Sequence, residues 1–130
     1  MRALTSMTWD ELLAHVREQW KVAIDARDRL GLLWTIGEGA SAEEQREMVE
    51  LVHRGGVSYV RITADVSPED SMSALEAVRA NSTLALGALA LDRHSYVLRA
   101  VLPLDALTTT VLDRSLELVA NEAARIRREL

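Results

Sequence analysis

Apolar residues recur at helical spacing near the start of the chain. They are separated by four, three and four residues, at Trp9, Leu13, Val16 and Trp20. This spacing places all four on one side of a helix, which we expect to run from about Trp9 to Gln19 or Trp20. Thr8 followed three residues later by Glu11 is typical of a capping box, so the helix is expected to begin there.

A period of two replaces the helical spacing after this point. Every second residue from Trp20 to Ala26 is apolar, which fits either a short strand or simply the exit from the helix. Residues 30–36 form a stronger apolar run, for which we expect a strand. Glycines at positions 37 and 39 then mark a loop.

Residues 41–53 support two interpretations. Ser41 and Glu44 have capping-box spacing, and the apolar residues that follow could form a helical stripe that ends at Gly55. Alternatively, residues 47–53 could pair with residues 57–66 in a hairpin, because Gly55-Gly56 suits a tight turn. The second of these strands is secure, since its apolar residues alternate from Val60 to Val66.

The segment after this strand carries strong signals for a helix start. Ser67 is suited to the cap, Pro68 to the first helical position, and two carboxylates follow. We expect a buried stripe at Met72, Leu75 and Val78. Asn81 is expected to be a left-handed C-cap.

Two further strands and a long helix complete the predicted order. Residues 83–91 and 96–102 are expected to form a hairpin joined by residues 92–95. The first of these strands is apolar on both faces, which predicts a central strand that is covered on both sides. Residues 104–130 are expected to form a helix capped by Asp105. Its apolar stripe comprises Leu112, Leu116, Val119, Ala123, Ile126 and Leu130.

The second half of the chain resembles the type III secretion chaperone-like and YbjN-like family. The matching features are Asn81, the runs at 87–91 and 96–99, and Leu102-Pro103-Leu104. The resemblance implies an α+β fold in which about five strands form a single antiparallel sheet with helices packed on it, in the order α-β-β-β-α-β-β-α. It also favours a strand at residues 47–53. It implies a non-enzymatic, chaperone-like module that binds a protein or peptide client, and a homodimer is a common form of the secretion chaperones.

Composition and charge narrow the class of protein. The 130 residues fit a single domain, and the net charge of −5 disfavours nucleic-acid binding. The chain has no cysteine, and its first residues lack a basic segment followed by an apolar run, so we expect a cytoplasmic protein without a secretory signal. No apolar run approaches the ~20 residues that cross a bilayer, so no membrane association is expected.

The ionisable residues do not form a recognisable reactive motif. The three histidines, at 15, 53 and 94, lie in different predicted elements without metal-ligand spacing. A triad of His94, Asp92 and Ser95 would have to form within one short turn, which its geometry forbids. The acidic run at 43–50 and the arginines at 125–128 are interpreted as solvated faces. We therefore expect no catalytic site, no metal and no cofactor.

The candidate partner-binding residues are Trp34, Tyr59, Arg61 and Arg99. They belong to the residue types that dominate binding hot spots, and all four would lie on one exposed face if helices covered only the other face of the sheet. An open sheet edge could also accept a strand from a partner. The alternative function is a regulatory or sensory domain that binds a small ligand between sheet and helix.

Overall fold

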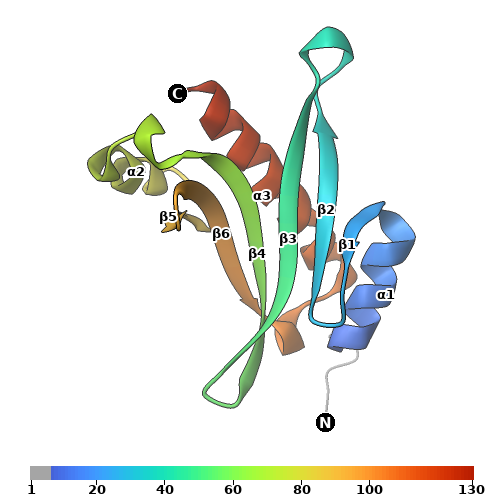
Figure 1. Ribbon diagram of the computed structural model, residues 1–130. Helices are drawn as coiled ribbons and strands as arrows, with labels where there is room; N and C mark the ends of the chain where they lie inside the picture. The colour runs from blue at the N-terminus through green and yellow to red at the C-terminus, as the bar shows by residue number, and fades with distance from the viewer. Residues whose placement is uncertain (1–6) are drawn as a thin grey trace.

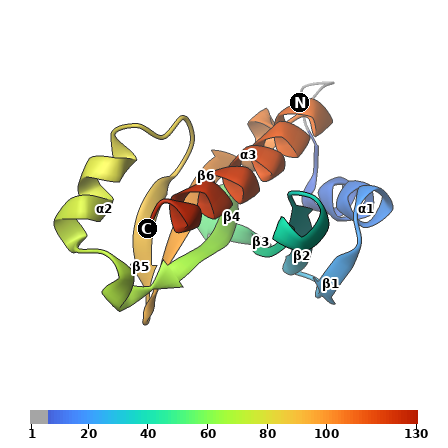
Figure 2. The same ribbon diagram turned by 90° about the horizontal axis from the view of Figure 1, so that it is seen from above.

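The computed structural model describes residues 7–130, so the beginning of the chain, on which the expectation about a secretory signal partly depends, lies outside the described residues. Residues 7–130 form one antiparallel sheet of six strands, in the order β1-β2-β3-β4-β6-β5, with three α-helices (Figure 1). Seen from above, α3 lies across one face of the sheet, α1 lies beside it near β1, and α2 lies beside β5 (Figure 2). The expected α+β class is confirmed, with six strands in place of about five.

The helices and strands follow one another in a simple order. The first half contains α1 (Trp9–Gln19), β1 (Val22–Asp25), β2 (Arg29–Ile36), β3 (Glu43–Arg54) and β4 (Val57–Pro68). The second half contains α2 (Ala74–Asn81), β5 (Ala88–Asp92), β6 (Ser95–Pro103) and α3 (Thr109–Arg128). Short 3₁₀ turns at Gly39–Ser41, Glu69–Ser71 and Leu104–Ala106 connect them. The sixth strand is β1, so the alternation after α1 marks a strand rather than only the exit from the helix.

The hairpin interpretation of residues 47–66 is confirmed. β3 pairs with β4 from Glu47↔Ala64 to Arg54↔Val57, and both turn glycines have positive φ, at 56° and 77°. Glycine adopts this conformation without the steric cost that other residues meet, and two such residues make the tight turn that matches strand twist. The capping-box pattern at Ser41 and Glu44 does not begin an α-helix, because the chain enters β3 at Glu43.

The long C-terminal helix supplies the central part of the core. Its expected stripe is buried from Leu112 to Ile126, whereas Leu130 is exposed. The helix begins later than predicted: the Thr108 hydroxyl caps it, and Asp105 belongs to a separate 3₁₀ turn. α3 packs mainly on β4 and also reaches β3 and β6.

The helix expected from Ser67 and Pro68 was misplaced. Both residues belong to β4, because Pro68 still pairs with Ser95 of β6, and the helix begins only after the Ser73 cap. This delay changes the buried side of α2. Ala77 is its buried residue, while Leu75 and Val78 are 58% and 66% exposed.

The strand expected at residues 83–91 is shorter than predicted and is not central. It begins at Ala88 and forms one edge of the sheet. Gly87 precedes it with a φ of 81°, and a Cβ at this position would lie 2.7 Å from the Arg99 carbonyl oxygen, so no other residue fits here without movement. Of the expected apolar strand, only Leu89 is buried within β5, because Leu84 and Leu86 precede the strand and Leu91 is 53% exposed.

Asn81 attaches this edge strand to α2. Asn81 is the last residue of α2, not a left-handed C-cap. Its Oδ1 accepts the Leu89 N–H at 2.6 Å, and its Nδ2 donates to the Leu89 carbonyl at 3.5 Å. The side-chain amide thus occupies both outward backbone groups of Leu89, as a neighbouring strand would.

We predict that Asn81→Ala selectively weakens this edge. The substitution removes the acceptor of the half-buried Leu89 N–H and should cost about 1–3 kcal/mol of unfolding free energy. Hydrogen exchange of the Leu89 amide should become faster, while exchange of the Ile62 amide on β4 should show only the global change. Unchanged exchange at Leu89 would show that the contact is unimportant.

A second prediction tests which helical residues support the core. Leu116→Ala should lower the unfolding free energy by about 2–5 kcal/mol, because the side chain is fully buried and its removal leaves a cavity. Val78→Ala, at an exposed helical position, should change it by less than about 0.5 kcal/mol. If urea denaturation showed similar losses of unfolding free energy for the two variants, the buried position of Leu116 and the exposed position of Val78 would be contradicted.

Candidate functional site: the uncovered face of the sheet

The sheet has one face under the helices and another face that no described helix covers. Side chains alternate between these faces along each strand. We call the uncovered face the open face, and its central row in register comprises Gly31, Met48, Thr63 and Arg99, on β2, β3, β4 and β6. It carries apolar side chains that are substantially exposed, including Ile24 at 46%, Leu33 at 44% and Val101 at 52%.

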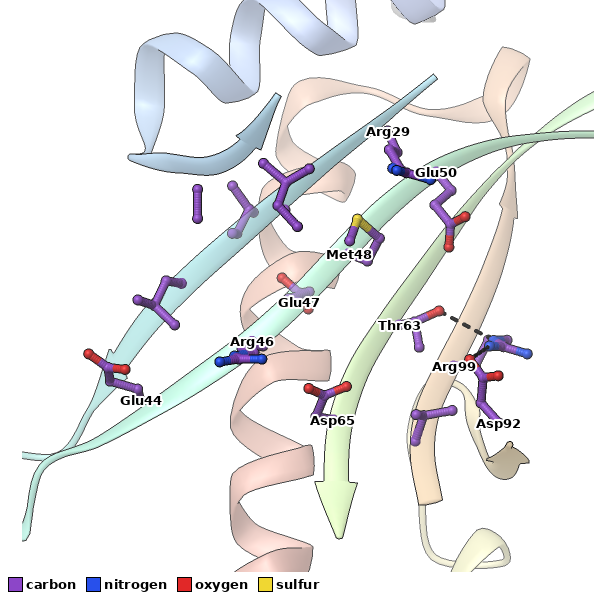
Figure 3. A pocket seen from close by; sticks show the side chains of 16 residues that line it. Arg29, Glu44, Arg46, Glu47, Met48, Glu50, Thr63, Asp65, Asp92 and Arg99 are labelled. Atoms are coloured by element: carbon purple, nitrogen blue, oxygen red, sulfur yellow. Dashed lines mark hydrogen bonds and ion pairs between the residues drawn. The ribbon is translucent and has the colours of Figure 1, made fainter. Parts of the chain in front are cut away.

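A hollow of about 630 Å³ extends over this face (Figure 3). Its lining includes residues from β1 to β6, with Met48 near the middle. Gly31 lies under Ile24, and a Cβ on Gly31 would come within 2.9 Å of the Ile24 Cβ. The small residue therefore lets the side chain of the neighbouring strand fold over β2 at one end of the hollow.

Two arginines of the open face form polar contacts across strands. The Arg99 guanidinium donates through Nε to Thr63 Oγ1 at 3.3 Å and through Nη2 to Asp92 Oδ2 at 3.2 Å (Figure 3). Arg61 Nη2 lies 3.4 Å from Glu50 Oε2. The open face thus combines exposed apolar side chains and Met48 with arginines and carboxylates, and methionine and arginine are enriched in protein interfaces.

Three of the four candidate residues lie together on this face. Tyr59 and Arg61 project from β4, and Arg99 projects from β6, where Thr63↔Arg99 and Arg61↔Val101 are paired in register. Of these three, Arg99 lines the hollow, whereas Tyr59 and Arg61 are not among its lining residues.

Trp34 does not join this group, contrary to expectation. It follows Leu30 and Leu32 at intervals of two, and therefore shares their helix-covered face. Its ring lies 5.6 Å from that of Trp20, and its Nε1–H donates to Glu47 Oε1 at 2.9 Å. The alternation of side chains along residues 30–36 could have indicated from the sequence alone that Trp34 shares a face with Leu30 and Leu32.

Glu47 is a buried acid that the sequence did not reveal. The acidic run at 43–50 is not one solvated face, because strand alternation places Glu44 and Glu50 on the open face and Glu47 beneath the helices. Glu47 is 2% exposed, and its Oε2 has no hydrogen-bond partner in the structure. Burial raises the pKa of Glu47 well above its ordinary value, against a smaller opposite effect of the Trp34 hydrogen bond.

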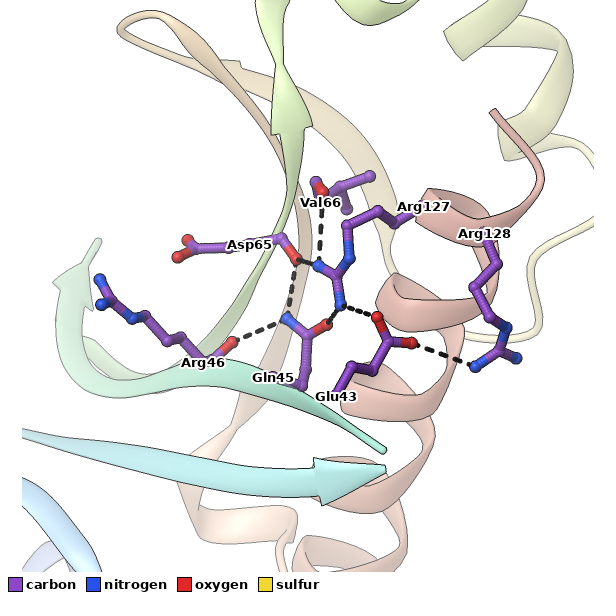
Figure 4. Close-up of polar contacts among 7 residues, drawn as sticks. All are labelled: Glu43, Gln45, Arg46, Asp65, Val66, Arg127 and Arg128. Carbon is purple, nitrogen blue, oxygen red and sulfur yellow. Dashed lines mark hydrogen bonds and ion pairs between the residues drawn. The ribbon is translucent and has the colours of Figure 1, made fainter. Parts of the chain in front are cut away.

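A polar cluster beside Glu47 joins α3 to the sheet where β3 and β4 separate (Figure 4). Arg127 donates to the Gln45 side chain at 2.7 Å, to Glu43 at 3.3 Å and to the carbonyl oxygens of Asp65 and Val66 at 3.2 and 3.4 Å. Gln45 Nε2 also donates to the Asp65 carbonyl, at 2.7 Å. Arg127 is therefore a structural clamp and not simply part of a solvated helix end.

The histidines remain apart. His15 contacts Asp113 at 2.8 Å, His53 contacts Ser58 at 3.0 Å, and His94 contacts Glu69 at 3.1 Å. Among residues 7–130 no group of three or more His, Cys, Asp or Glu side chains could hold a metal ion.

Comparison with models of known protein families, with curated proteins and with solved structures found no match. Within the described part of the chain, no helix is both long enough and apolar enough to cross a membrane.

We predict that Glu47→Gln stabilises the protein at neutral and higher pH. Because the pKa of Glu47 is raised in the folded state, its contribution to stability is fully present below the unfolded pKa and is lost as pH rises through the folded pKa. Glutamine keeps an acceptor for Trp34 without this loss. Urea denaturation at about pH 8 should therefore favour the variant, with an advantage that shrinks towards about pH 4.

The matched control is Glu44→Gln, which removes the same charge from the exposed side of β3. It should not reproduce this trend with pH. A difference between Glu47→Gln and the unaltered protein that stays constant over the whole pH range would contradict a buried, proton-binding Glu47.

Proposed function

We propose that this protein is a non-enzymatic, chaperone-like module that binds a protein or peptide through the open face of its sheet. The observation that carries the proposal is a broad, hollowed sheet face that no described helix covers, on which exposed apolar side chains lie among charged side chains of both signs. Burying such a mixed surface against a partner removes apolar area from water and fixes the orientation of the partner through its charges.

The edges of the sheet are less suited to this role than its face. Strand addition needs a run of free backbone groups. β5 has only five residues, and Asn81 occupies the outward groups of Leu89. At the other edge, β1 has four residues and a bulge between Val22 and Ile24. Short, irregular and occupied edges are typical of sheets protected against strand addition.

The resemblance to the type III secretion chaperone-like and YbjN-like family supports the same proposal. It suggests a peptide or protein client, and it makes a homodimer part of the hypothesis. The absence of cysteine agrees with action in a reducing compartment such as the cytoplasm.

We predict that Leu33→Glu weakens client binding at least about tenfold, because the new carboxylate would have to lose its water against the apolar part of the partner. Leu33 is exposed and lies opposite Arg46 in register, so the folded protein should tolerate the change. Partners captured from the native host would be identified with the unaltered protein, and their affinities would then be measured with purified components.

Val78→Glu is the matched control, since it places the same charge at an exposed apolar position of α2, away from the open face. It should leave client binding unchanged. If sedimentation shows a monomer and no partner is captured at micromolar concentration, the proposed binding function is contradicted. If a client is captured but binds both variants alike, the open face is not the binding surface.

A small-ligand sensor is the second candidate function, with the ligand in the hollow of the open face rather than between sheet and helix as expected from the sequence. The volume of the hollow lies within the range of about 300–1,000 Å³ that is common for ligand pockets. Native mass spectrometry of protein isolated from its host would show a bound small molecule in this case, and Met48→Arg in the middle of the hollow would abolish that extra mass.

A further inference from the structure

Three charged residues form a row in register on the open face. Arg29 on β2 pairs with Glu50 on β3, and Glu50 pairs with Arg61 on β4. The row has two guanidinium groups for one carboxylate, so its local charge is positive although the whole chain has a net charge of −5. One further negative charge would neutralise it.

The central contact of the row is incomplete. Glu50 and Arg61 share one contact, at 3.4 Å, which is long for a charge-assisted hydrogen bond. The Nε of Arg61 is buried and has no hydrogen-bond partner in the structure. A buried donor without an acceptor is destabilising, so the free protein does not hold Arg61 in its most favourable arrangement.

Glu50 has a second cation within its reach. Arg29 is exposed and forms no ion pair with any residue between 7 and 130, and it lies opposite Glu50 on the side away from Arg61. Figure 3 shows the Arg29 and Glu50 side chains next to one another at one end of the hollow. The carboxylate of Glu50 can therefore move from Arg61 to Arg29 without leaving the row.

We propose that this row is a carboxylate-binding subsite, in which Glu50 transfers to Arg29 and an aspartate or glutamate side chain of the bound partner takes its place on Arg61. The partner carboxylate pairs with Nη2 and with Nε, which is buried in the free protein and becomes accessible as the Glu50 and Arg61 side chains move. This inference rests on the proposed function of the open face. The exchange replaces one long ion pair with two pairs, and the partner carboxylate supplies the acceptor that Nε lacks. A bidentate pair of this kind requires arginine, because the lysine ammonium has no planar fork.

The surroundings define the chemistry of the partner more closely. Glu44 and Asp65 on the same face form no ion pairs among the described residues, and their negative charges disfavour a doubly charged phosphate. Met48 lies two residues before Glu50 on β3, on the same face, and lines the hollow. Since alternate side chains of an extended segment point the same way, the matching partner segment has an acidic residue with apolar residues two positions away.

The test uses two synthetic seven-residue peptides with blocked ends. Both have threonine at odd positions and leucine at the second and sixth positions, with aspartate in one peptide and asparagine in the other at the fourth. Binding is followed by NMR through the Arg61 Nε–H resonance and the Met48 methyl resonance. The aspartate peptide should bind at least about tenfold more tightly, and it alone should shift the Arg61 Nε–H resonance.

Variants of the row test the exchange itself. Arg61→Lys should abolish the preference for aspartate, and Arg29→Gln should reduce it because Glu50 then has no second cation. Glu50→Gln should increase the affinity for the aspartate peptide, since Arg61 no longer has an internal competitor. Arg54→Gln, an exposed arginine beyond the row on β3, and Glu44→Gln serve as matched controls and should leave the preference unchanged.

The outcomes separate this inference from the proposed function. Equal shifts of Met48 by both peptides, without a preference for aspartate, would overturn the carboxylate subsite and leave the open face as a binding surface. No shift of Met48 with either peptide would count against both. Weaker binding of the aspartate peptide to Glu50→Gln would overturn the exchange.

Discussion

The packing of α3 on one face of the sheet is the interaction on which the rest of the structure depends. Leu112, Leu116 and Val119 are completely buried, and they cover the central strands. Side chains alternate along a strand, so the residues that lie between those under α3 must point to the opposite face. The open face is thus a direct consequence of a two-layer architecture that has helices on one side only.

The end of α3 adds a second constraint. Glu47↔Ala64 is the last pair between β3 and β4 at this end, and beyond it Gln45 and Arg127 supply the hydrogen bonds that a continued ladder would have made. Glu47 is buried at this junction with one oxygen unpaired, which is destabilising when the group is charged. The opposite side of the same junction, at Arg46 and Asp65, lines the hollow. The separation of the strands therefore shapes the candidate site as well as the core.

Patterns with several consistent local signals predicted the fold well. The capping box at Thr8, the alternating residues of β4 and the stripe of α3 each specify one element, and the structure has these elements. The start of α2 was misplaced because Ser67 and Pro68 suit a helix start, while pairing of Pro68 with Ser95 keeps the chain in the sheet. Long-range pairing of this kind overrides local preference and leaves no local mark in the sequence.

The candidate site was predictable only in part, for a related reason. Tyr59 and Arg61 lie on one side of a strand with clear alternation, so their common face followed from the sequence. The alternation of side chains along β2 places Trp34 on the other face, with Leu30 and Leu32. Nothing in the sequence indicates that Glu47 is buried, because it lies in a run of acidic residues. The row of Arg29, Glu50 and Arg61 depends on the register between three strands, which the sequence does not state.

The most direct test of the account compares two methionine methyl groups by NMR while a purified client is added to the protein. Met48 lies on the open face, whereas Met72 belongs to the buried core, and its carbonyl oxygen accepts a hydrogen bond from the Tyr96 hydroxyl. The client should shift or broaden the Met48 methyl resonance and leave that of Met72 in place. A client that perturbs Met72 and does not affect Met48 would contradict the account.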